Sequence, residues 1–275
     1  MGALTADGKG VLPRPAADMN TLIETMTPAD LRSAAAAAER GGAVPLSDVE
    51  LLAPIPRPRQ DVVCLGMNYR DHAEESARYS ADAFTKNSTA AVYFSKRVSE
   101  AGKPDGVIPR HAGLTDRLDY EAELAVVLGK AARDVKAADA ADYIFGYTVL
   151  NDVSARDLQT GQKQWYFGKS LDDFTPMGPC IVTADEIAYP PALKITAKVN
   201  GELRQNGTTD MLITDIDHII SELSHGMTLK AGTRIATGTP AGVGMGMDPP
   251  CFLKEGDVVE CEIEKIGKLR NKIVK

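Results

Sequence analysis

DYEAELAVVLG, residues 119–129, is an acidic segment that runs directly into an apolar one. The β-branched pair Val126-Val127, followed by a glycine, predicts a β-strand. Alternate side chains of a strand lie on the same face, so Asp119, Glu121 and Glu123 are expected to share one. Three carboxylates on one face repel each other, and burial is costly for each unless a positive charge lies among them.

A hard divalent cation with oxygen ligands would remove that repulsion, and Mg²⁺, Mn²⁺ and Ca²⁺ are cations of this kind. The alternative is an edge strand whose acidic face meets water. The stretch by itself leaves both interpretations open, so the choice between them depends on which other side chains the chain brings to this strand.

The bulk composition is that of an ordinary globular protein: 275 residues, 44% hydrophobic and 25% charged. A net charge of −7, from 31 Lys and Arg against 38 Asp and Glu, argues against nucleic acid or an anionic membrane as a partner. No apolar run approaches the roughly 20 residues that span a bilayer, and the N-terminus lacks a secretory pattern. Without any CxxC pair among the four cysteines, we expect a cytoplasmic protein with reduced thiols.

Short apolar runs separated by glycine turns predict the fold. Strands are expected at residues 62–66, 91–95, 118–128, 145–150, 195–199, 234–237 and 258–263, and helices at 71–78, 137–144 and 213–224. Asn200-Gly201 lies between two strands and predicts a hairpin with a type I′ turn. Because strands and helices do not alternate regularly, a β-rich α+β fold is favoured over a parallel α/β sheet.

The N-terminal part of the chain has a different texture. Residues 1–20 are rich in Gly, Pro and small residues and are expected to be extended or poorly ordered, whereas residues 27–40 are expected to form an alanine-rich helix that begins with a Thr-Pro cap. The proline-rich segment 54–58 is a stiff connector. We therefore predict a small N-terminal region at 1–57 and a larger main domain at 58–275.

A further oxygen ligand is available at the end of another strand. Asp152 follows the apolar run 145–150 directly, and polar residues at the end of a buried strand often belong to a site. Asp152 could complete a three-carboxylate cage with Glu121 and Glu123. The alternative is that Asn151 or Asp152 caps the turn or helix that follows.

Two further positions carry side chains suited to acid–base or electrostatic chemistry. His72 and Glu75 are three residues apart and share a face of the expected helix, where a carboxylate that orients an imidazole makes a general base. The alternative is an exposed histidine beside a surface glutamate. Lys169 could bind a carboxylate or stabilise an enolate oxygen, or it could simply lay its aliphatic stem on Trp165.

A glycine-rich loop, residues 237–244, follows an expected strand. It has neither the GxxxxGK[ST] order of a phosphate-binding loop nor the GxGxxG of a dinucleotide-binding fold. Its amides and hydroxyls could still hold a substrate carboxylate, as successive backbone amides do in other anion sites. The alternative is a turn without a binding role.

Taken together in their order and spacing, these segments resemble the fumarylacetoacetate hydrolase family over roughly residues 60–272. The matching pieces are GMNYRDHAEE (66–75), LDYEAELAVVLGK (118–130), GYTVLNDVSARDLQ (146–159), GKSLDDFTPMGP (168–179), NGELRQNGTTDMLI (200–213) and ATGTPAGVG (236–244). A single piece would be a weak signal, whereas the ordered set is specific to the family.

The resemblance implies a mixed, rolled β-structure, commonly dimeric, so a homodimer is expected. It implies that Mg²⁺ or Mn²⁺ is bound by Glu121, Glu123 and Asp152. It implies that His72 and Glu75 form a water-activating pair and that Lys169 is a catalytic lysine. It also implies three substrate contacts, at Arg156, Gln159 and Thr239. Asp119 belongs to the motif but is not among the usual ligands, which suggests an orienting role.

The resemblance also implies an enzyme that acts on a small 2-oxo acid. The first hypothesis is hydrolysis of a carbon–carbon bond in an acylpyruvate or fumarylacetoacetate-type acid through a metal-stabilised enolate. The second is oxaloacetate decarboxylation or tautomerisation, or hydration or isomerisation of an unsaturated 2-oxo acid, at the same site. The third is a non-catalytic protein stabilised by its metal. Substrate specificity is expected to come from a lid at 72–90 and from Tyr79, Phe84 and Met245.

Overall fold

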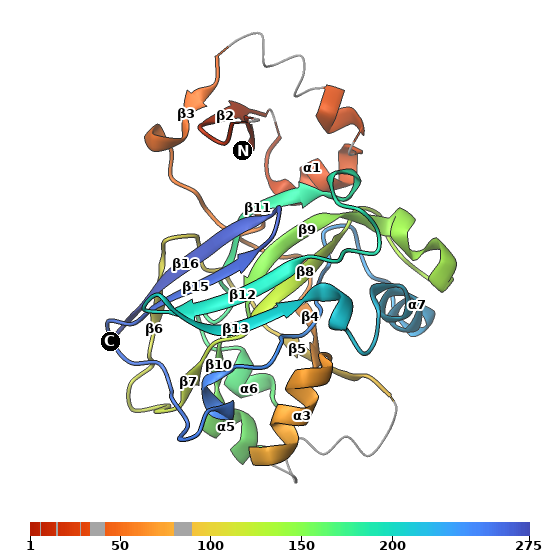
Figure 1. The fold of residues 1–275 in the computed structure, drawn as a ribbon. Coiled ribbons are helices and arrows are strands. Elements are labelled where there is room, and N and C mark those ends of the chain that lie inside the picture. Colours follow the sequence, from red (N-terminus) through yellow and green to blue (C-terminus); the bar gives the residue numbers. More distant parts are fainter. Residues whose placement is uncertain (6, 15, 28, 34–41, 80–89) are drawn as a thin grey trace.

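The computed structural model describes residues 1–275 except 6, 15, 28, 34–41 and 80–89. Two sheets pack face to face (Figure 1). The larger has six strands in the order β11 (Met177–Thr183), β9 (Ile144–Asn151), β8 (Ala122–Leu128), β14 (Arg234–Ala236), β4 (Val62–Gly66) and β5 (Val92–Lys96). The smaller has five, in the order β13 (Glu202–Thr208), β12 (Lys194–Val199), β15 (Val258–Ile263), β16 (Gly267–Val274) and β6 (Val107–Pro109).

Neighbouring strands in both sheets are antiparallel except for the pairs β14–β4 and β16–β6, which are parallel. This mixed, strand-rich architecture confirms the expected β-rich α+β class. The predicted strands of the two sheets are all present, and apart from the strand predicted at 118–128 their ends differ by no more than a residue or two.

Strand β8 is buried on both faces. Leu124 and Val126 belong to the core between the two sheets, whereas Ala125 and Val127 belong to separate apolar clusters. Because side chains alternate along a strand, Glu123 points to the same side as Ala125 and Val127. The acidic end of the motif therefore lies on the face of the larger sheet that is turned away from the smaller sheet.

The predicted strand over residues 118–128 is in part wrong, because the chain breaks it in two. Strand β7 (Leu118–Asp119) pairs with β10 (Ser154–Ala155) in a small sheet of its own, and β8 begins only after Glu121. In the break, the N–H of Glu121 donates to Asn151 Oδ1 at 3.0 Å. The Asn151 side chain thus takes the place of a backbone partner on a neighbouring strand, and Asp119 no longer lies on the face that Glu121 and Glu123 share.

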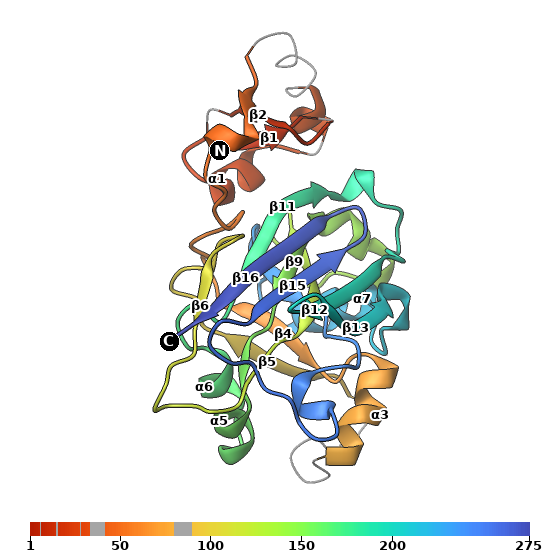
Figure 2. The same cartoon turned by 60° about the vertical axis from the view of Figure 1, so that its left-hand side comes forward.

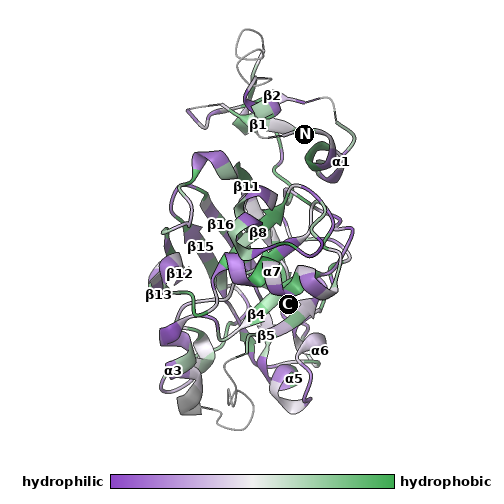
Figure 3. Cartoon of the chain, turned by 90° about the vertical axis from the view of Figure 1, so that its right-hand side faces the viewer, coloured by the Kyte–Doolittle hydropathy of each residue, from purple (hydrophilic) through white to green (hydrophobic). Residues whose placement is uncertain are grey.

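Three short helices gather at one end of the larger sheet: α3 (Arg70–Tyr79), α5 (Arg156–Gly161) and α6 (Tyr166–Lys169) (Figure 1). Helix α7 (Ile216–Gly226) packs its apolar face into the core, as the spacing of its isoleucines predicts. In Figure 3 the hydrophobic colour is concentrated in the strands and α7, whereas α3 is mainly hydrophilic. None of the helices in the described residues is long and apolar enough to span a bilayer.

The N-terminal residues are more ordered than expected. β1 (Gly2–Leu4), β2 (Gly10–Pro13) and β3 (Val44–Pro45) form a separate three-stranded sheet at the far end of the molecule from α3, α5 and α6 (Figure 2). Helix α1 (Met19–Thr25), which was not predicted, packs in one apolar cluster with Val127 of β8.

The expected helix at 27–40 begins as predicted, since Thr27 and Asp30 exchange hydrogen bonds in a capping box. Its continuation over 34–41 lies outside the described residues. The predicted helix at 137–144 is present as a 3₁₀ helix, Ala137–Tyr143. The boundary between regions 1–57 and 58–275 stays a prediction.

The β12–β13 hairpin provides a test of the turn prediction. Asn200 and Gly201 have φ angles of 52° and 83°, the left-handed pair that a type I′ turn requires. Gly201→Ala is expected to lower the free energy of unfolding by about 1 kcal/mol through backbone strain alone, because no atom lies within 4 Å of the new methyl. Gly161 is equally open but does not have a positive φ, so Gly161→Ala should be neutral or stabilising. If urea unfolding showed the same loss of unfolding free energy for Gly201→Ala and Gly161→Ala, the prediction would be wrong.

Candidate active site

A pocket lies where β4, β5 and β8 meet helices α3, α5 and α6. Its empty volume, including the open space at its mouth, is about 330 Å³. Its polar lining comes from His72, Glu121, Glu123, Arg156, Gln159, Lys169 and Thr239, and its apolar lining from Leu65, Met67, Phe94 and Trp165. Seven of the nine predicted site residues therefore line one cavity, while Glu75 and Asp152 lie behind it.

The three predicted metal ligands lie together. One carboxylate oxygen from each of Glu121, Glu123 and Asp152 lies within 4.8 Å of the others, and all three residues are buried. The strand register explains this, because Ala122 at the start of β8 pairs with Asn151 at the end of β9. The alternative of Asn151 or Asp152 as a helix cap does not hold, since α5 has no side-chain cap.

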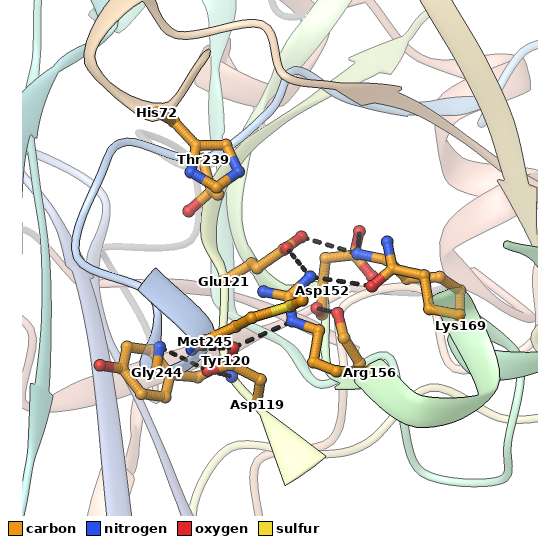
Figure 4. Close-up of polar contacts among 12 residues, drawn as sticks. His72, Asp119, Tyr120, Glu121, Asp152, Arg156, Lys169, Thr239, Gly244 and Met245 are labelled. Atoms are coloured by element: carbon orange, nitrogen blue, oxygen red, sulfur yellow. Dashed lines mark hydrogen bonds and ion pairs between the residues drawn. The ribbon is translucent and has the colours of Figure 1, made fainter. Parts of the chain in front are cut away.

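Two buried lysines hold Asp152 between them. Lys169 Nζ donates to Asp152 Oδ2 and to Glu121 Oε2, both at 2.7 Å (Figure 4). Lys96 Nζ donates to Asp152 Oδ1 at 2.5 Å. Burial alone would lower the pKa of Lys169, but Asp152 and Glu121 outweigh it and raise that pKa. At Lys96 burial prevails and the pKa is lowered.

Sequence reasoning missed Lys96. It is completely buried and ends β5, one residue beyond the predicted strand. A lysine that directly continues an apolar strand was the available signal. Its partner Asp152 lies on another strand, so the pairing itself is visible only in the structure.

Glu123 lacks the cationic partners that Glu121 and Asp152 have. It accepts a hydrogen bond from the N–H of Gly238 at 2.8 Å, and within the described part of the chain no Lys or Arg forms an ion pair with it. Burial, followed by the carboxylates of Asp152 and Glu121, raises the pKa of Glu123. By contrast, burial of Glu121 is outweighed by Lys169 and Arg156, which lower its pKa to about 2.

The charges of the site suit a divalent cation. Five buried carboxylates (Glu75, Asp119, Glu121, Glu123 and Asp152) face three buried cations (Lys96, Arg156 and Lys169), which leaves a surplus of two negative charges when all are ionised. A group of oxygen donors without sulfur or imidazole favours Mg²⁺ or Mn²⁺ over zinc. The metal expected from the sequence therefore fits the side chains that are present.

The predicted general-base pair is assembled and buried. His72 Nδ1 lies 3.0 Å from Glu75 Oε2, and the two residues are 6% and 4% exposed. This rules out the alternative of an exposed histidine beside a surface glutamate. Because Glu75 occupies Nδ1, the other ring nitrogen, Nε2, is the one left to exchange a proton in the pocket.

The predicted substrate contacts differ in how far their polar atoms are already engaged. Arg156 Nη1 lies 2.7 Å from Glu121 Oε1 and donates to Gln159 Oε1 at 3.0 Å. Thr239 donates its hydroxyl to the carbonyl of Ala122 and accepts a hydrogen bond from Gln205 Nε2, both at 2.8 Å. The Thr239 hydroxyl thus ties the glycine-rich loop to β8.

The amides of the glycine-rich loop and of Met245, which follows it, bind the protein's own carboxylates; a substrate carboxylate was one possibility that the sequence left open for the loop. The N–H of Gly238 donates to Glu123, and that of Gly242 donates to Glu75. The N–H groups of Gly244 and Met245 both donate to Asp119.

The predicted lid lies only partly within the described residues: Phe84 lies outside them and the side chain of Tyr79 is not described.

Comparison with known proteins identifies the family. Residues 61–274 match the family model described as the C-terminal domain of fumarylacetoacetate (FAA) hydrolase. The chain belongs to the fumarylacetoacetate hydrolase family. It is therefore an enzyme of a family that acts on 2-oxo acids with a divalent metal, and the third hypothesis, a non-catalytic protein, is not supported.

Three relatives within the family illustrate its range. The chain is 47% identical over 228 residues to the oxaloacetate tautomerase YisK of Bacillus subtilis, covering 83% of this chain and 74% of that one. It is 39% identical to a fumarylacetoacetate hydrolase from Exiguobacterium antarcticum, with a TM-score of 0.78 over 99% and 98% of the two chains. It is 31% identical to maleylpyruvate hydrolase from Sphingobium sp. SYK-6, solved with manganese(II) and pyruvate, with a TM-score of 0.78 over 99% and 95%.

Proposed function

We propose that this protein interconverts the keto and enol forms of oxaloacetate or of a closely similar 2-oxo dicarboxylic acid, with Mg²⁺ or Mn²⁺ as cofactor. One observation carries the proposal: Glu121 and Glu123 of the carboxylate group line the same cavity as the His72 imidazole, with Asp152 beside them just behind the lining. The 47% identity to an oxaloacetate tautomerase supports this choice of reaction. The proposal follows the second of the two enzymatic hypotheses.

Keto–enol conversion needs a proton removed from C3 of the acid and a proton added at its 2-oxo oxygen. When bound by the three carboxylates, the cation supplies positive charge that favours the enol. His72 Nε2 is the base for the C3 proton, because the Glu75 carboxylate holds Nδ1 and stabilises the imidazolium. Arg156 and Gln159 bind a carboxylate of the acid, and Lys169 keeps a positive charge beside the ligands Glu121 and Asp152.

A second candidate is hydrolysis of a carbon–carbon bond in an acylpyruvate. The buried His72–Glu75 pair favours it, because such a pair can also remove a proton from water. Similarity to a maleylpyruvate hydrolase favours it as well. In this reaction water adds to the distal carbonyl, the bond between that carbon and its neighbour breaks, and the departing fragment leaves as the enol of pyruvate.

His72→Gln is expected to lower kcat for oxaloacetate tautomerisation about 100-fold, the usual contribution of a positioned general base. The decay of enol absorbance with Mg²⁺ present measures it. His225 is exposed, with 88% of its side chain accessible, so His225→Gln should keep the wild-type rate. Acetylpyruvate is assayed in parallel. Wild-type cleavage of acetylpyruvate without acceleration of oxaloacetate tautomerisation would support the second candidate instead.

We further propose that the protein forms a homodimer and that residues 1–57 form a region distinct from the catalytic domain 58–275. Family membership supports the dimer, and the separate sheet β1–β2–β3 supports the distinct region. The mass in solution tests the first proposal. Limited proteolysis tests the second, since cleavage is expected to concentrate in the connector 54–58 and to leave a resistant larger fragment.

A further inference from the structure

Asp119 is the carboxylate of the acidic motif that lies outside the ligand group, and it is completely buried. Its two oxygens accept four hydrogen bonds (Figure 4). Oδ1 accepts from the N–H groups of Tyr120 at 2.9 Å and Gly244 at 2.8 Å. Oδ2 accepts from the N–H of Met245 and from Arg156 Nε, both at 2.9 Å. Asp119 thereby joins the substrate-binding arginine to the glycine-rich loop.

The same loop also holds the general-base pair. The N–H of Gly242 donates to Glu75 Oε1 at 2.9 Å, and the Tyr120 hydroxyl donates to the carbonyl of Gly242 at 2.8 Å. The segment therefore contacts Glu75 through Gly242, and it contacts Asp119 through Gly244 and Met245. Any shift of this segment moves the support of both Glu75 and Arg156.

Two glycines allow the loop to lie this close. A Cβ on Gly244 would lie 2.8 Å from Asp119 Oδ1 and 2.3 Å from the carbonyl oxygen of Cys251. A Cβ on Gly246 would lie 2.3 Å from Glu75 Oε1. Both glycines are required for direct packing of the loop against these two carboxylates.

We propose that Asp119 is a positioning residue for substrate binding: it sets the orientation of the Arg156 guanidinium relative to the loop that holds Glu75. With Nε fixed by Asp119, the guanidinium plane is set, and Nη1 is aimed at Glu121 and Gln159. The Arg156 guanidinium, which binds the substrate carboxylate, and the His72–Glu75 pair, which moves the proton, then stay at a constant distance from each other. The identity of the substrate rests on the proposed function, but the positioning role does not.

Asparagine is a sharp test at this position because it has the shape of aspartate. All four partners of the carboxylate are donors, and each oxygen faces two of them. In either orientation, the NH₂ group of asparagine would meet two N–H groups where an acceptor is needed. The Arg156 guanidinium or the loop must then move away.

The test measures the dissociation constant of oxalate by calorimetry at saturating Mg²⁺, together with KM and kcat for oxaloacetate. Asp119→Asn is expected to weaken oxalate binding about tenfold and to raise KM more than it lowers kcat. In an Arg156→Lys background, which lacks the Nε–H, Asp119→Asn should change the oxalate constant less than about twofold, because the two residues act as a unit.

Asp157 provides the matched control. Its carboxylate also accepts backbone and hydroxyl donors, but these belong to Thr115, Asp116 and Leu158 and not to the glycine-rich loop. Asp157→Asn should bind oxalate as the wild type does. Should Asp119→Asn not fold, Asp119→Glu keeps the charge, shifts the carboxylate by one methylene, and is expected to weaken oxalate binding in the same way.

The proposal is overturned when the Asp119 variant binds oxalate within twofold of wild type, or when its full effect persists with Arg156→Lys. Oxalate binding does not depend on turnover. A wild-type protein that binds oxalate but turns over no 2-oxo acid would therefore contradict the proposed function alone, while the comparison of variants would still decide the role of Asp119.

Discussion

Glu123→Gln is expected to lower metal-dependent kcat/KM by at least about 10³-fold, equivalent to several kcal/mol of lost transition-state stabilisation, without lowering the stability of the metal-free protein. The two halves of this result have different causes. Turnover is lost because one of three carboxylate ligands is removed. Stability is retained because no Lys or Arg of the described residues pairs with Glu123, so a neutral amide relieves repulsion with Asp152 and Glu121.

Glu121→Gln is the informative counterpart. Glu121 is paired with Lys169 and Arg156, so its neutralisation should abolish turnover and also destabilise the metal-free fold. Thermal melting with and without Mg²⁺, beside the kinetic assay, separates the two effects. Retention of a Mg²⁺-induced rise in melting temperature by Glu123→Gln would show that the cation does not depend on this ligand.

Asp152→Asn is expected to lower the free energy of unfolding by about 3 kcal/mol or more, because two buried ammonium groups lose their shared partner. Lys96 and Lys169 are 0% and 1% exposed, and each contacts a different oxygen of Asp152. Denaturant unfolding of the metal-free protein measures this loss. Adding Lys96→Met to Asp152→Asn should restore part of the stability, since it removes one of the uncompensated charges.

An exposed ion pair provides the comparison. Arg57 and Glu100 lie 3.4 Å apart, with 80% and 63% of their side chains exposed. Glu100→Gln should therefore change the free energy of unfolding by less than about 1 kcal/mol. A similar loss for Glu100→Gln and Asp152→Asn would mean that burial does not set the cost at Asp152.

Local patterns were sufficient for much of the fold. Apolar runs and glycine turns located most strands of both sheets, because the apolar side chains of each run have to be buried, but they did not locate β6, β11 and β16. Asn200-Gly201 identified its hairpin because both residues tolerate a positive φ. The carboxylate group was also predictable, since Glu121 and Glu123 are neighbours on one face and Asp152 directly follows the end of a strand.

Other features depend on partners far away in the chain. The break before β8 arises because Asn151 supplies a side-chain acceptor to Glu121, which no local pattern signals. Lys96 was missed because its partner Asp152 comes from a different strand. The N-terminal strands were missed because their composition is that of loops, and pairing among β1, β2 and β3 overrides it.

The position of β14 determines when, during folding, this protein can first hold a cation. β14 lies between β8 and β4 and pairs Ile235 both with Val126 and with Val63, so the central part of the larger sheet closes only after most of the chain is present. Such distant pairings form slowly. The loop after β14 then brings the amides that hold Glu123 and Glu75. In a nascent chain that still lacks β14, the three acidic ligands are therefore without the sheet and loop that hold them together, and the ligand group can assemble only after most of the chain has been made.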